Sequence, residues 1–196
     1  MNKLSIADIR SFVSSFHPEV HKRSDLIPAG VLMLLFERDG ELSVVLTERT
    51  HEVEHHKGQI SFPGGVMDVT DATIIETALR ETEEEVGLSR TSIEVMGLLN
   101  DFSTPSGFRI TPVVAFLPFV PSFSINKAEV TEVFDVPLSF FLDVRNERRK
   151  RLERSGTMID VYFYHYGKYE IWGATATMIR LFLHAFSDWA EHKKAL

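Results

Sequence analysis

The first third of the chain passes from helical to strand spacing of its apolar residues. Residues 4–16, LSIADIRSFVSSF, carry apolar side chains three and four positions apart, which predicts an amphipathic helix. The apolar run 29–36 and the segment 42–49 flank Asp39-Gly40, which indicates two core strands joined by a hairpin turn. Residues 59–62 then predict a short strand that ends in a turn at Pro63-Gly64-Gly65.

The pattern after this turn predicts a helix, several strands and a terminal helix. The helix is expected over residues 72–86, with Thr70 or Asp71 as its side-chain cap and Gly87 as its end. Strand patterns follow at 93–101, at 109–120, before Pro137, and in a hairpin about Gly167-Lys168, and an amphipathic helix is expected over about 174–193. Strands interleaved with helices favour one domain over residues 1–196, with a mixed sheet covered by helices on both faces.

Composition narrows the class of protein. With 196 residues, 44% of them hydrophobic and 25% charged, the chain is typical of one globular domain. It contains no cysteine, which excludes disulfides and thiolate metal sites. We see neither a secretory signal nor an apolar run of about 18 residues, so a cytoplasmic protein without a membrane span is expected.

The net charge of −7 argues against broad nucleic-acid binding. One segment differs, because residues 145–156, RNERRKRLERSG, are strongly basic. We interpret this segment as a solvated loop or helix face in preference to a phosphate-binding arm.

The helix that follows the glycine pair carries the candidate chemistry. A rotation of about 100° per residue places Glu81, Glu84 and Glu85 on one face and Glu83 on the other side. A separate apolar stripe is expected to pack against the sheet, formed by Ile75, Leu79, Thr82 and Val86. Arg80 lies one turn from both Glu76 and Glu84, so it is expected to bridge them.

Crowded carboxylates repel one another, so a cation is expected beside them. Carboxylates at this spacing, next to a backbone carbonyl of Gly64 or Gly65, would form an all-oxygen site suited to Mg²⁺ or Mn²⁺. The alternative is a solvated acidic helix face without a ligand.

The segment RETEEEVGL, residues 80–88, resembles the second half of the Nudix box, G-x5-E-x7-R-E-U-x-E-E-x-G-U, where U is aliphatic. Thr82 stands where an aliphatic residue is usual, and Val66 and Ala72 stand where the box has Gly and Glu. The longer turn FPGGxxDxxD, residues 62–71, is similar to that of the coenzyme A pyrophosphatase branch of the family.

The upstream segment resembles the same branch. Its signature residues are matched by Leu46, Thr47, Arg49, Gly58, Phe62, Pro63, Gly64 and Gly65. Thr50 and Glu54 depart from it, because the branch has Ser or Ala and Arg at these positions. Glu54 places an anion where the branch has a cation, so a substrate phosphate that this Arg would contact must be bound differently here.

The resemblance implies a Nudix-type α/β/α sandwich around a mixed β-sheet. It implies metal-dependent hydrolysis of the diphosphate of coenzyme A or its thioesters, giving adenosine 3',5'-bisphosphate and 4'-phosphopantetheine. Two alternatives stay open: hydrolysis of another nucleotide such as ADP-ribose, NADH or a dinucleotide, and a non-catalytic Nudix-fold binding module. The expected partner is a small nucleotide without nucleic acid or membrane, and a homodimer is left open.

The resemblance also distributes roles among residues. Glu81, Glu84 and Glu85 are the expected catalytic metal ligands, with Arg80 beside them and the Gly65 carbonyl as a further ligand. The general base stays open between Glu84 and a loop carboxylate, Glu129 or Glu132. Candidate substrate-binding residues are Arg49, His56, Lys57, Phe108 and Arg109.

Overall fold

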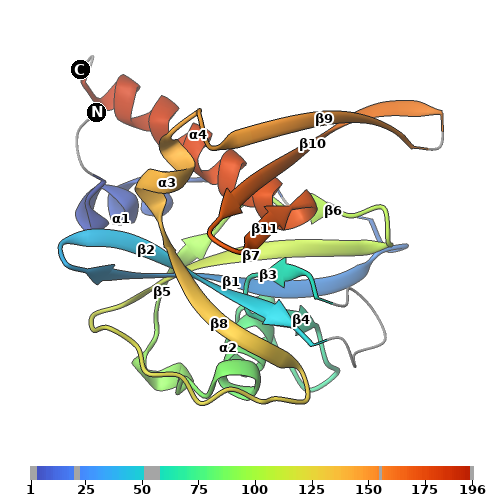
Figure 1. The fold of residues 1–196 in the computed structure, drawn as a ribbon. Helices are drawn as coiled ribbons and strands as arrows, with labels where there is room; N and C mark the ends of the chain where they lie inside the picture. The colour runs from blue at the N-terminus through green and yellow to red at the C-terminus, as the bar shows by residue number, and fades with distance from the viewer. Residues whose placement is uncertain (1–3, 20–22, 51–57, 155, 195–196) are drawn as a thin grey trace.

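A mixed eight-stranded sheet forms the centre of the molecule (Figure 1). The computed structural model describes residues 4–19, 23–50, 58–154 and 156–194. The main strand order is β3-β2-β1-β7-β5, while β4 pairs with β1, β6 with β7 and β8 with β2. The strands are β1 (Ile27–Arg38), β2 (Glu41–Arg49), β3 (Ile60–Ser61), β4 (Gly64–Val66), β5 (Glu94–Leu98), β6 (Phe102–Ser103), β7 (Phe108–Leu117) and β8 (Val130–Pro137). The β1–β7 pair is parallel and β1 pairs antiparallel with β2 and β4, so the sheet is mixed.

Helices cover both faces of this sheet, which confirms the predicted α/β/α arrangement (Figure 1). The acidic helix α2 (Ile74–Val86) packs on one face, against Leu32 and Leu34 of β1. The other face, with Met33 and Leu35, is covered by three α-helices: α1 (Ile6–Ser15), α3 (Leu138–Leu142) and α4 (Gly173–Lys194). Because β1 is buried on both faces, its apolar run is continuous instead of alternating.

A second, three-stranded sheet lies on the α4 side in the order β11-β10-β9. It consists of β9 (Glu147–Arg154), β10 (Thr157–Tyr166) and β11 (Tyr169–Trp172). The β10–β11 hairpin turns at Gly167-Lys168, as predicted. None of the helices in the described part of the chain has the length and apolar character needed to cross a bilayer.

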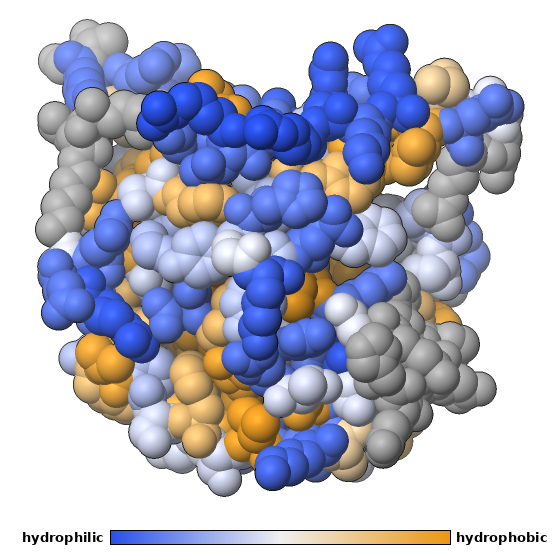
Figure 2. Space-filling model, in the orientation of Figure 1, coloured by the Kyte–Doolittle hydropathy of each residue, from blue (hydrophilic) through white to orange (hydrophobic). Residues whose placement is uncertain are grey.

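The interpretation of the basic segment 145–156 as a loop or helix face is wrong. Most of it is the edge strand β9, in which Leu152 and Lys150 pair with Ile159 and Val161 of β10. This apolar partner strand determines the extended conformation, which the run of charges in β9 conceals. Figure 2 shows the resulting hydrophilic side chains projecting along the top of the molecule, over the β9–β10 hairpin.

The prediction of a turn at Pro63-Gly64-Gly65 is also wrong for the two glycines. Both belong to β4, which pairs antiparallel with Gly30 and Val31 of β1. Gly64 has a φ of 147°, and a Cβ there would lie 2.4 Å from the carbonyl oxygen of Gly30. Close approach of two strands, and not a reversal of the chain, is therefore what these glycines permit.

The start of α2 differs from the prediction as well. The helix begins at Ile74, and its N-cap is Thr73, whose side chain accepts a hydrogen bond from the backbone N–H of Glu76. Asp71 is unavailable as a cap because its carboxylate binds Arg80. Gly87 ends the helix in the left-handed conformation, with φ 71°, as predicted.

We predict that Gly30→Ala destabilises the fold by displacing α2. A Cβ at Gly30 would lie 2.6 Å from the Ile74 carbonyl oxygen and 3.2 Å from the Ala78 nitrogen. Overpacking of this kind costs about 1–3 kcal/mol. Urea unfolding should show a lower midpoint for this variant, and an unchanged midpoint would contradict the close packing of α2 on β1.

Candidate metal centre

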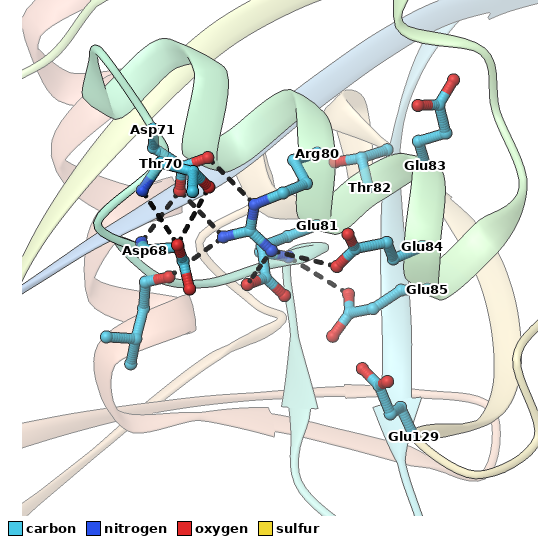
Figure 3. Close-up of polar contacts among 12 residues, drawn as sticks. Asp68, Thr70, Asp71, Arg80, Glu81, Thr82, Glu83, Glu84, Glu85 and Glu129 are labelled. Carbon is cyan, nitrogen blue, oxygen red and sulfur yellow. Dashed lines mark hydrogen bonds and ion pairs between the residues drawn. The ribbon is translucent and has the colours of Figure 1, made fainter.

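Three carboxylates meet beside the start of β8. Glu81 and Glu85 lie one turn apart on α2, and Glu129 directly precedes β8 (Figure 3). One carboxylate oxygen from each lies within 4.8 Å of the others. Hard divalent cations prefer oxygen donors of this kind, so the three residues form a candidate cation site.

Glu85 is the most buried member of this cluster. Its side chain is 1% exposed, and its Oε2 accepts a hydrogen bond of 3.1 Å from the backbone N–H of Gly64. Its Oε1 lies 3.3 Å from Nη1 of Arg49. Both contacts favour the ionised form, but burial outweighs them and raises the pKa of Glu85 to about 8.

Glu81 lies against the backbone of β4. A Cβ at Gly65 would be 2.5 Å from Cδ of Glu81, so only glycine leaves room for this carboxylate. Burial also raises the pKa of Glu81, against the lowering effect of Arg80. The helix and the glycine strand thus hold two carboxylates in a poorly solvated position.

Arg80 connects α2 to the loop before it (Figure 3). Its Nε and Nη2 donate to the two oxygens of Asp71 at 3.0 and 2.9 Å, and Nη2 also donates to the carbonyl of Val66 at 3.2 Å. Its Nη1 donates to Glu81 at 2.8 Å and to Glu84 at 3.0 Å. The hydrogen bonds from Arg80 hold the pKa of Asp71 well below its usual range.

The predicted bridge from Arg80 to Glu84 is confirmed, but the predicted bridge from Arg80 to Glu76 does not form. The carboxylate of Glu76 instead accepts a hydrogen bond of 2.7 Å from the backbone N–H of Ala72. Glu76 therefore helps to cap the start of the helix, and Arg80 is left to hold Asp71.

Glu84 shares the helix face of Glu81 but does not belong to the three-oxygen cluster. Its side chain is 52% exposed, so its predicted role as a metal ligand stays a prediction. Glu83 points to the other side of α2, where it pairs with Arg90 at 2.7 Å, in agreement with the helical spacing. The buried part of the predicted stripe includes Thr82 and Val86, which are inaccessible to solvent.

Glu129 completes the cluster, and its sequence position gives only a weak signal of this. Glu132, the other carboxylate of this segment that could act as a base, instead pairs with Lys168 at 2.5 Å. Glu129 is 44 positions from Glu85 (129 − 85), and they meet because β8 pairs with β2, whose Arg49 lies opposite Val130.

The expected substrate-binding residues are not all brought together. Arg49 lies at the cluster through its contact with Glu85. Arg109 and Phe108 lie in β7, on the edge of β1 opposite to β4, where Arg109 pairs with Asp101 at 3.8 Å. His56 and Lys57, like Glu54, fall outside the described residues.

Comparisons with known proteins match this architecture. The NUDIX domain family matches residues 26–154. A Photorhabdus laumondii protein named uncharacterized Nudix hydrolase NudL is 37% identical over 177 residues, which cover 90% of this chain and 95% of that protein. An Escherichia coli protein of the same name is 32% identical over 177 residues, covering 90% and 92% of the two chains.

A solved structure shares the fold. The crystal structure of the Nudix hydrolase RenU from M. smegmatis superimposes with a TM-score of 0.51 at 23% sequence identity. The superposition covers 60% of this chain and 74% of the other.

The burial of Glu85 predicts a pH dependence of stability for the metal-free protein. Its folded pKa of about 8 lies above the unfolded value, which is about 4.3. The folded state therefore binds the extra proton between these values, and the free energy of unfolding falls as pH rises from about 5 to about 8. Glu85→Gln should flatten this slope and stabilise the metal-free protein at pH 8 by on the order of 1–2 kcal/mol.

Glu83→Gln is the matched control, because Glu83 lies on the same helix but is exposed and bound to Arg90. The free energy of unfolding is measured by urea denaturation of the unmodified chain, Glu85→Gln and Glu83→Gln, with a chelator, at pH 5.5 and pH 8. The explanation by Glu85 fails if Glu85→Gln retains the pH dependence of the unmodified chain, as Glu83→Gln should.

Proposed function

This chain belongs to the Nudix family of hydrolases, and from that premise we propose that it hydrolyses the diphosphate linkage of coenzyme A or its thioesters. The products would be adenosine 3',5'-bisphosphate and 4'-phosphopantetheine, free or acylated. The observation that carries the proposal is the cluster of Glu81, Glu85 and Glu129 beside the glycine strand β4.

The donor set fits a hard divalent cation, Mg²⁺ or Mn²⁺. The cluster offers carboxylate oxygens only, and the chain has no cysteine to offer a thiolate. Nudix hydrolases as a family use divalent metals. When bound, such an ion neutralises the diphosphate and lowers the pKa of a water molecule. Glu81 and Glu85 are the proposed principal ligands, with Glu129, Glu84 and the Gly65 carbonyl as further candidates.

Two arginines have different proposed roles. Arg80 contacts Glu81, Glu84 and Asp71 at once, so it orients carboxylates and keeps them apart. Arg49 is close to Glu85 yet 26% exposed, so its guanidinium is available to a substrate phosphate at the rim of the cluster. Arg109, Phe108, His56 and Lys57 remain proposed substrate contacts.

Glu84 and Glu129 are the proposed candidates for the general base. The exposed carboxylate of Glu84 is held by Arg80 at 3.0 Å, and it is accessible to water. Glu129 is already within the cluster, which favours it as a ligand. A base must reach the attacking water, and the exposure of Glu84 favours it over Glu129 for this role.

The choice of coenzyme A rests on the resemblance of residues 46–65 and 62–71 to the coenzyme A pyrophosphatase branch. ADP-ribose, NADH or a dinucleotide is the second candidate, because Thr50 and Glu54 depart from that branch. Retention of Glu81, Glu84 and Glu85 favours hydrolysis over a non-catalytic binding module.

A substrate panel tests the proposal. The purified chain is incubated with Mg²⁺ or Mn²⁺ and coenzyme A, acetyl-coenzyme A, ADP-ribose, NADH or diadenosine tetraphosphate, and the products are separated by chromatography. We expect the highest kcat/KM for coenzyme A or its thioester, with release of adenosine 3',5'-bisphosphate. Faster cleavage of ADP-ribose or NADH would replace coenzyme A as the substrate, and no cleavage at all would reject hydrolysis.

Glu85→Gln should reduce kcat by at least about a hundredfold on the best substrate, because it removes a proposed ligand and its charge. Glu83→Gln removes the same charge from the opposite side of α2 and should leave kcat within about twofold of the unmodified enzyme. Far-UV circular dichroism checks that both variants fold. Equal losses in the two variants would reject the metal role of Glu85.

A further inference from the structure

A polar cleft lies near the carboxylate cluster. It is a cleft of about 360 Å³ between the end of β2 and β3 on one side and the β10–β11 hairpin on the other. This volume is at the lower end of the roughly 300–1,000 Å³ typical of ligand pockets. Its lining residues include two aromatic residues, Tyr169 and Trp172, two acidic residues, Glu48 and Glu170, and the basic residue Lys168. None of these residues belongs to the cluster.

Trp172 is held with one face of its ring covered. The ring stacks on Phe163 of the neighbouring strand, with centroids 6.0 Å apart and planes at 9°. Phe163 is buried, but Trp172 is 40% exposed and lines the cleft. A large rigid aromatic face is therefore presented to solvent on β11, the outer strand of its sheet.

The ring of Tyr169 is already in contact with other side chains. Phe134 stacks on it with centroids 3.6 Å apart, and the ammonium of Lys168 lies 5.0 Å from its centroid. Lys168 is in turn bound to Glu132 at 2.5 Å. Trp172 is therefore the aromatic side chain of the cleft that remains for a ligand.

The charged groups of the cleft select the chemistry of that ligand. Glu170 and Trp172 are two positions apart on β11, so their side chains emerge on the same face. Glu48 approaches from β2, and within the described part of the chain its carboxylate makes no hydrogen bond or ion pair. Ionised carboxylates only accept hydrogen bonds. The ring of His165 lies 3.6 Å from Glu170, and Lys168 in the cleft wall is bound to Glu132 at 2.5 Å. The carboxylates of Glu48 and Glu170 favour a flat ligand that carries N–H donors.

We propose that this cleft binds the adenine base of the substrate, stacked on Trp172, with its exocyclic amino group donating to Glu48 or Glu170. The inference rests on the proposed function, since coenzyme A, ADP-ribose, NADH and diadenosine polyphosphates all carry adenine. It adds a base-binding subsite shared by these candidates.

The cleft and the cluster lie at the same strand end. Glu48 lines the cleft, and the next residue, Arg49, contacts Glu85. Gly58 also lines the cleft, and its backbone N–H binds the carbonyl of Arg49 at 3.1 Å. A nucleotide bound at this end of β2 would place its base in the cleft and its diphosphate at the carboxylate cluster.

Tryptophan fluorescence tests the subsite without any turnover. The probes are AMP and IMP, which contain no anhydride bond and differ in the group at purine position 6. The chain has two tryptophans, and Trp189 packs against Phe12 and Phe186 between α1 and α4. We expect AMP to quench emission in the unmodified chain and in Trp189→Phe, and not in Trp172→Phe.

The same titrations distinguish recognition of the base from non-specific quenching. AMP should bind more tightly than IMP, whose carbonyl oxygen faces the carboxylates. Glu48→Ala together with Glu170→Ala should reduce this preference to within about twofold. Equal quenching by AMP and IMP in the unmodified chain, or quenching that persists in Trp172→Phe, would overturn the proposal.

Kinetics provides a second test. Trp172→Ala should raise KM for the best adenine substrate roughly tenfold or more, which is the usual effect of losing one base–aromatic stack, with little change in kcat. Trp189→Ala is the control for loss of a tryptophan. If the chain hydrolyses no substrate but AMP quenches Trp172, the subsite stands and the proposed function fails. If hydrolysis is robust and KM is unchanged in Trp172→Ala, the subsite is rejected.

Discussion

The close packing of α2 on a pair of glycine-containing strands is the constraint on which the site depends. Gly64 lets β4 approach β1, Gly30 lets α2 approach β1, and Gly65 leaves room for Glu81. The backbone N–H of Gly64 can then reach Glu85 at 3.1 Å. A side chain at any of these positions would meet another group within 2.6 Å, so the helix could not lie at this distance from the strands.

This packing buries the carboxylates of Glu81 and Glu85 away from solvent. Burial raises the pKa of both Glu81 and Glu85, although Arg80 and Arg49 contact them. The burial of these carboxylates is therefore unfavourable for folding as long as no cation neutralises them. Arg80 limits the cost of the arrangement, because it bonds Asp71, Glu81 and Glu84 simultaneously and fixes their orientation.

Two neighbouring residues at the end of β2 serve different parts of the site. Arg49 contacts Glu85 of the cluster, whereas Glu48 lines the cleft beside the β10–β11 hairpin. The smaller sheet therefore does more than cover the α4 face of the main sheet. It supplies Trp172 and Glu170 close to the strand end at which the carboxylates gather.

The sequence by itself determined the features that depend on local periodicity. Apolar spacing located α1, α2 and α4 and the core strands, and the helical rotation separated Glu83 from the other carboxylates. Features that depend on distant partners were decided only by the tertiary structure. Pairing with Gly30 made a strand of Gly64 and Gly65, and pairing of β8 with β2 brought Glu129 to Glu85 while Glu84 remained half exposed. The reason is physical: spacing along one element determines which face a side chain shares, whereas the partner it meets depends on which segments, far apart in the chain, pack together.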